Sequence, residues 1–196
     1  MNSYVIGIIS LGLFFSLFFL IEKITPSRMN KEFTRKIAHI LAGLFAVLIA
    51  LILESSAFLL LSTIPVIIML LAYRVRLFTF IHNVGRSTIG EILFPVGVIA
   101  SYLIAGPTTV FYASILILTF ADTMGSLAFR FSKKLPYCNS IVFFLVALII
   151  LGAFYGFQPN IIAIVFLVTI IEKFSPYGSD NLSIPVSSVL LIRLLL

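Results

Sequence analysis

Polar residues that could bind a charged ligand are concentrated in one stretch, from Glu172 to Pro185. It contains the carboxylates Glu172 and Asp180, the amide Asn181 and three serines, in a chain that is 61% hydrophobic. Burying such groups beside hydrocarbon is costly unless they find partners. Oxygen ligands suit a hard cation such as Mg²⁺, which usually binds together with phosphate. The stretch therefore indicates a site for a charged ligand, although a polar turn between two helices would also account for it.

Further polar residues lie inside or beside apolar segments. Asp122 is within a strongly apolar segment, and helical spacing predicts a stripe of Thr119, Asp122, Ser126 and Arg130. A carboxylate in such a place favours a functional role.

Basic residues open two other apolar segments. Arg35, Lys36 and His39 begin one of them, and helical spacing predicts that Lys36, His39 and Gly43 share a face. Glu91 follows Arg86 at the start of another segment. Each has a structural alternative, since His39 could make an ordinary polar contact and Glu91 could pair with Arg86.

Composition restricts the elements that can position these residues. A chain of 196 residues with 10% charged residues lacks the polar surface of a soluble domain, and its apolar runs match the length of membrane helices. Alternating strand patterns are absent, so we expect an all-α polytopic membrane bundle. The single cysteine excludes an internal disulfide. Seven spans are expected, with an eighth left open, at residues 4–21, 37–53, 57–73, 89–105, 108–129, 141–155, 161–171 and, for the short last segment, 184–196.

The positive charges predict the orientation. Twelve of the thirteen Lys and Arg lie in the connections after spans one, three, five and seven, and only Arg193 lies elsewhere. The positive-inside rule then places the N-terminus outside and these connections in the cytoplasm. The candidate residues thus converge on the cytoplasmic face of an inner membrane or endomembrane, and Glu54 is the one acid on the other face. A nucleic-acid surface is not indicated, because the basic residues sit at the ends of spans.

The phosphate-binding motifs typical of soluble nucleotide-binding proteins are missing from the sequence. Residues 85–90 have the glycine spacing of a P-loop, but Glu91 and Ile92 stand where Lys and Ser or Thr are required. A nucleotide would therefore be bound by helix ends, basic side chains and carboxylate-bound Mg²⁺.

Four segments together resemble the integral-membrane CTP-dependent lipid kinases: dolichol kinase, phytol kinase and the fungal type of diacylglycerol kinase. They are residues 35–39 (Arg-Lys-Ile-Ala-His), 90–95 (Gly-Glu-Ile-Leu-Phe-Pro), 121–126 (Ala-Asp-Thr-Met-Gly-Ser) and 180–185 (Asp-Asn-Leu-Ser-Ile-Pro). The family is distantly similar to the CDP-diacylglycerol synthases. The resemblance covers most of the chain from Arg35 to Pro185, and it implies transfer of the γ-phosphoryl group of CTP to the hydroxyl of a long-chain lipid alcohol. We expect residues 1–196 to form a single transmembrane domain.

The chain departs from the family in two places. The Gly-Arg-x-Phe-Gly segment after the aspartate helix keeps Arg130 and Phe131 but loses both glycines. After Leu135-Pro136-Tyr137, the Lys and Gly-Ser of the phytol kinases are absent. An altered substrate or an inactive member therefore stays open.

The resemblance assigns roles to the candidate residues. Mg²⁺ ligands would be Asp122, Asp180 and Glu172. Catalytic roles fall to Asp122, Asp180, His39 and Glu91, and nucleotide or phosphate binding to Lys36, Arg35, Arg86, Ser126, Arg130, Lys133 and Asn181. The partners expected are CTP and a membrane lipid alcohol, with a homodimer left open.

Two other functions compete with the kinase. A CTP:phosphatidate cytidylyltransferase would use the same metal and nucleotide but release pyrophosphate, and it ranks second because its signature needs two further acids near Asp180. An ion-coupled transporter ranks third. It predicts polar residues through the whole membrane depth and an internal repeat, whereas the candidate residues here converge on one face and the sequence shows no repeat.

Overall fold

The computed structural model describes residues 2–24, 31–75, 89–131 and 137–196. These residues fold as α-helices with one π-helical segment, and no strand occurs among them. The predicted all-α class is confirmed for this part of the chain.

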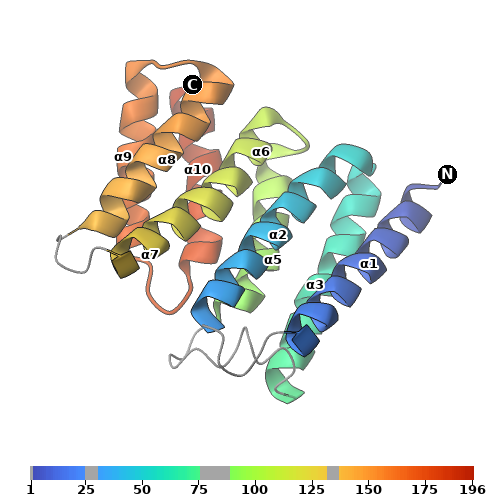
Figure 1. Cartoon of the computed structure of the whole chain (residues 1–196). Helices are drawn as coiled ribbons and strands as arrows, with labels where there is room; N and C mark the ends of the chain where they lie inside the picture. Colours follow the sequence, from blue (N-terminus) through green and yellow to red (C-terminus); the bar gives the residue numbers. More distant parts are fainter. Residues whose placement is uncertain (1, 25–30, 76–88, 132–136) are drawn as a thin grey trace.

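Each apolar run of the sequence corresponds to one helical rod (Figure 1). The fifth rod is continuous, and it consists of α6, the π-helical segment η1 and α7. The helices are α1 (Ser3–Ile24), α2 (Lys31–Ile52), α3 (Ser55–Val75), α5 (Gly90–Ala105), α6 (Thr109–Leu116), η1 (Ile117–Ala121), α7 (Asp122–Phe131), α8 (Cys138–Tyr155), α9 (Pro159–Lys173) and α10 (Asp180–Leu195).

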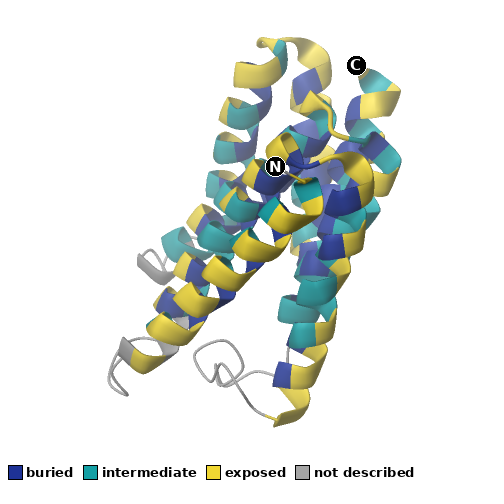
Figure 2. Ribbon diagram, turned by 90° about the vertical axis from the view of Figure 1, so that its right-hand side faces the viewer, coloured by how far each residue is buried: buried dark blue, intermediate teal, exposed yellow. Residues whose placement is uncertain are grey.

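Five helical stretches of the described chain are long and apolar enough to cross a membrane. They are Ser3–Ile21, Phe33–Ile52, Ser55–Val75, Thr109–Ala128 and Cys138–Tyr155, and Gly90–Ala105 is a shorter apolar helix. Many large apolar side chains, such as Leu13, Leu60 and Leu103, are exposed on the outer faces (Figure 2). A lipid surround explains such exposure, so these helices support the class of a helical membrane protein. The number of spans and their orientation stay predictions.

Successive rods run in opposite directions, so the bundle has two distinct ends (Figure 1). At one end, here called the Glu54 end, lie both termini and the short connections 53–54, 106–108 and 156–158. Gly106 (φ 66°) and Gly156 (φ 76°) end α5 and α8 there in a conformation that suits glycine. The opposite end, here called the Asp180 end, carries the 174–179 connection and the start of α10.

The buried side chains form two apolar clusters that meet along α6. One joins α1, α2, α3 and α5, and the other joins η1, α8, α9 and α10. Dark blue positions in Figure 2 follow the inward faces of the helices. This packing brings α2 against η1 and α7, and α10 against η1.

Two features go beyond the sequence prediction. The short apolar segment 184–196 belongs to a longer helix, because α10 begins at Asp180, whose carboxylate lies in the first turn and interacts favourably with the helix dipole. The fifth span was expected to be one regular helix, but residues 117–121 are π-helical. The predicted stripe from Thr119 to Ser126 therefore passes through a change of helical register.

Candidate active site

The centre of the candidate site is a buried ion pair between α2 and α7. Lys36 Nζ lies 2.7 Å from Asp122 Oδ2 and donates a hydrogen bond to it. The two residues are only 5% and 9% exposed. Both charges are removed from solvent, so each depends strongly on the other. The sequence predicted both residues as members of the site, and the fold brings them together.

His39 lies one turn after Lys36 and completes this centre. Its Nε2 lies 3.8 Å from Asp122 Oδ2 and 3.2 Å from the carbonyl oxygen of Leu118. A carbonyl can only accept, so the shorter contact is a hydrogen bond when Nε2 carries the proton. Nδ1 is then the ring nitrogen left to accept a proton. The ring of Phe94 holds the imidazole edge-on at 5.0 Å between ring centroids.

A close helix approach sets the distance between these residues. A Cβ atom at Gly43 would overlap Thr119 Oγ1 and lie 2.8 Å from Thr119 Cβ, so α2 approaches η1 this closely only because residue 43 is glycine. Lys36, His39 and Gly43 all face the same rod, as their helical spacing predicted.

The π-helical turn directly before Asp122 was not anticipated. Single π turns often mark functional sites, because they widen the helix and change the direction of the side chains that follow. Here the turn contains Leu118, whose carbonyl contacts His39, and it ends at Ala121, directly before Asp122. No sequence signal identifies such a turn, although the acid in an apolar segment points to its location.

Two more carboxyl groups gather beside Asp122. Burial, followed by the charges of Asp122 and Asp180, raises the pKa of Glu172 to about 7. Burial and then the charge of Asp122 raise the pKa of Asp180 to about 6. Both acids lie outside the five candidate spans. The negative charge of Asp122 in α7 therefore disfavours the ionised forms of Glu172 in α9 and Asp180 in α10, and a cation at this end of the bundle would favour them.

Asn181 joins these acids to α5. Its backbone N–H donates to Asp180 Oδ1 at 2.9 Å, while its own Oδ1 is buried with no hydrogen-bond partner in the described chain. Pro185 has no N–H, so the Asn181 carbonyl also lacks its usual helical partner. Gly97 permits the close approach of α5 to α10, because a Cβ atom at residue 97 would overlap the Asn181 carbonyl oxygen. The sequence did not single out Gly97.

A half-open apolar cavity begins at this site and runs between α1, α2, α3 and α5. It encloses about 1040 Å³ of empty space, including the part that opens to the surroundings. Its polar rim consists of Arg35, His39, Glu91 and Asn181, and the rest of its described wall, apart from Ser62, is apolar. Arg35 and Glu91 therefore lie at the mouth of the cavity. The sequence analysis did not predict this cavity.

The other predicted residues are less closely connected to this centre. Ser126 donates its hydroxyl to the carbonyl of Thr123 at 2.9 Å. Arg130 belongs to α7, but its side chain, together with Arg86 and Lys133, lies outside what the structure describes.

Among the described residues, no three His, Cys, Asp or Glu side chains lie close enough to form a ready-made metal cage. The oxygen atoms nevertheless suit a hard cation. Glu172 Oε2 and Asn181 Oδ1 are buried and have no hydrogen-bond partners in the described part of the chain. Mg²⁺ commonly takes only one or two protein carboxylates and completes its shell with phosphate and water. The donor set therefore fits Mg²⁺ that arrives with a phosphate ligand.

Comparison with known proteins gives no match, whether with protein-family models, curated proteins or solved structures.

Proposed function

We propose that this chain is an integral-membrane phosphotransferase that moves the γ-phosphoryl group of CTP to the hydroxyl of a long-chain lipid alcohol. One observation carries the proposal. The buried pair of Lys36 and Asp122 lies beside His39, which belongs to the polar rim of an apolar cavity, and the acids Glu172 and Asp180 are near enough for the charge of Asp122 to act on them. Phosphoryl transfer needs positioned charges more than covalent chemistry, and this cluster supplies charges of both signs.

The basic residues suit a triphosphate. Lys36 has three N–H donors, of which one is directed at Asp122, so it can bridge that carboxylate and a phosphate oxygen. Arg35 lies on the same rim. Asp122, Asp180 and Glu172 would hold Mg²⁺, with Asn181 beside them. When bound, Mg²⁺ would neutralise charge on the phosphate oxygens.

His39 is the proposed base. Its Nδ1 would accept the proton of the lipid hydroxyl while the alcohol oxygen bonds to the γ-phosphorus. The bond from that phosphorus to the β-phosphate oxygen breaks, and its electron pair leaves with CDP. Glu91, also on the rim, is the second candidate for accepting this proton.

The topology proposed is N-terminus outside, seven to eight spans and the Asp180 end in the cytoplasm, where CTP is available. The charges support it, because Lys23, Arg74 and Lys173 lie in the last turns of α1, α3 and α9, all of which end there.

The test uses purified protein with Mg²⁺, a mixed lipid extract and CTP labelled separately at the α and γ phosphates. Label that moves from the γ position into lipid, with release of CDP, supports the kinase. Label that moves from the α position, with release of pyrophosphate, identifies a cytidylyltransferase instead. If neither label moves while the protein binds CTP, the phosphotransferase proposal is wrong.

A further inference from the structure

The apolar cavity extends far beyond what a hydroxyl group needs. Its lining follows α2 from Arg35 to Ile49 and includes Leu53, just after the end of the helix. The eighteen residue steps from position 35 to position 53 correspond to about 27 Å at 1.5 Å per residue. A hydrocarbon core is ~30 Å thick, so the cavity is nearly as long as such a core is thick. An ordinary membrane lipid chain occupies about half of that depth.

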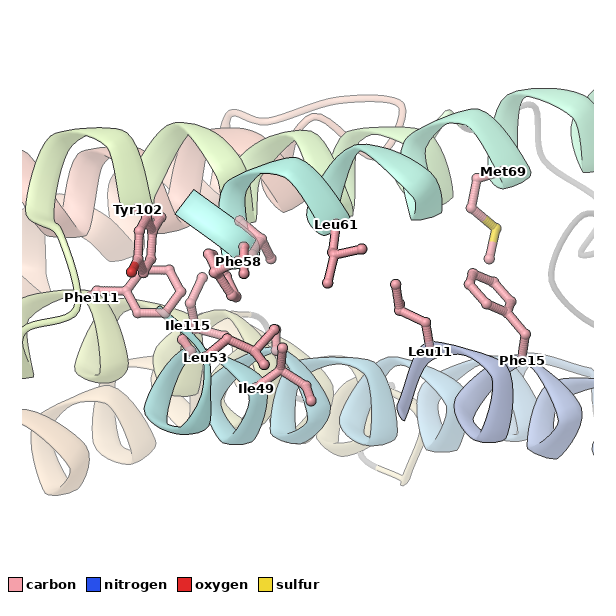
Figure 3. Close-up of a cluster of buried hydrophobic side chains, with 14 of the residues drawn as sticks. Leu11, Phe15, Ile49, Leu53, Phe58, Leu61, Met69, Tyr102, Phe111 and Ile115 are labelled. Carbon is pink, nitrogen blue, oxygen red and sulfur yellow. The ribbon is translucent and has the colours of Figure 1, made fainter. Parts of the chain in front are cut away.

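The lining is suited to one flexible apolar chain. Along α2, residues Ala38, Ala42 and Ala46 recur at every turn and leave the space open. In Figure 3, Leu61 and Met69 of α3 face Leu11 and Phe15 of α1 across the cavity. Polar groups of the described lining gather at the rim, apart from Ser62.

An aromatic cluster closes the far end. The centroid of the Phe58 ring lies 4.2 Å from that of Tyr102 and 6.0 Å from that of Phe111. The ring centroids of Tyr102 and Phe111 are 5.2 Å apart. Tyr102 is fixed further by a 3.0 Å hydrogen bond to Ser55 Oγ. Phe58 lines the cavity, and its ring packs with those of Tyr102 and Phe111 as a floor beyond Leu53 (Figure 3).

We infer that this cavity holds the hydrocarbon chain of the lipid substrate lengthwise and limits its length at the Phe58–Tyr102–Phe111 floor. The hydroxyl then sits at the rim beside His39, and the chain tip reaches the Glu54 end. The identity of the polar group as a hydroxyl rests on the proposed function, whereas the place of the chain does not. The substrate class is a single-chain alcohol longer than one leaflet is deep.

Substitutions along α2 test the inference, because they block the cavity at different depths. Ala42→Phe fills it about one helical turn nearer the rim than Ala46→Phe does, roughly 6 Å. Leu48→Phe is the matched control, because Leu48 is 53% exposed and does not line the cavity. None of these residues touches the reacting groups.

With a graded series of primary alcohols, Ala42→Phe should lower transfer to the longest alcohols on the order of tenfold while sparing short ones. Ala46→Phe should place the limit at a longer chain, and Leu48→Phe should leave the profile unchanged. Identical profiles for all three variants and the wild type would overturn the inference.

A binding experiment separates this inference from the proposed function. A long primary alcohol with a diazirine at its chain tip is bound to the full-length protein in nanodiscs, photolysed and mapped by mass spectrometry. Labelling at Ile49, Leu53 or Phe58 supports the chain site even if no phosphoryl transfer occurs. Labelling confined to outward residues such as Leu48 and Leu51 overturns it even if transfer is observed.

Discussion

Lys36 and Asp122 are separated by 86 positions in the sequence, yet Lys36 Nζ lies 2.7 Å from Asp122 Oδ2 inside the bundle. The pair connects α2 to α7 directly after the π-helical turn. It therefore has a structural effect whatever its chemical role, and variants must separate the two.

Replacing one member of this pair should be more harmful to the fold than replacing both. Lys36→Met or Asp122→Leu alone leaves a buried charge unpaired, and we expect a loss of about 3–5 kcal/mol in the free energy of unfolding. The double variant Lys36→Met/Asp122→Leu should recover most of this stability but no phosphoryl transfer. Thermal unfolding, followed by the loss of helical circular dichroism, measures the first effect. Recovery of transfer in the double variant would contradict a catalytic role.

The approach of α2 to η1 should depend on Gly43. Gly43→Ala places a methyl group against Thr119, and this should move Lys36 and His39 relative to Asp122 and reduce transfer about tenfold or more. Adding Thr119→Ala removes two of the three clashing atoms and should restore part of the activity. Equal activity of Gly43→Ala and wild type would show that this contact does not position the site.

The free energy of unfolding should decrease as pH rises, because of Glu172. Its pKa of about 7 in the folded protein lies above the ordinary value of 4.5, so the folded state holds the proton more tightly between these values. The free energy of unfolding should therefore decrease as pH rises from about 4.5 to about 7. Glu172→Gln should flatten this dependence in thermal unfolding with chelator present, leaving the part that comes from Asp180. An unchanged slope in Glu172→Gln would contradict the burial of this carboxyl group among like charges.

The proposed orientation predicts opposite labelling of two positions. In a Cys138→Ser background, Glu54→Cys should react with an impermeant maleimide from outside, and Tyr177→Cys only after the cytoplasmic face is opened. Both side chains are exposed, so access through the aqueous phase decides the result. The reverse pattern would invert the topology and place the site outside.

Much of the fold could be predicted from the sequence, because apolar length and helical spacing are local properties. The eight apolar runs became helices, and Lys36, His39 and Gly43 do share a face. Three features depend instead on how the helices pack. They are the pairing of Lys36 with Asp122, the π-helical turn and the cavity. Pattern alone does not contain that information, because one apolar face looks the same whether it meets another helix, lipid or an empty space.

The most direct test of the central claim is γ-phosphoryl transfer from CTP to a long-chain alcohol by wild type, Asp122→Asn, Asp180→Asn and the matched control Glu54→Gln. Glu54 is an exposed acid at the opposite end of the bundle, so its variant should keep wild-type activity. We predict that both aspartate variants, checked for folding by thermal unfolding, lose on the order of a hundredfold or more in rate. Wild-type rates in both would contradict the account.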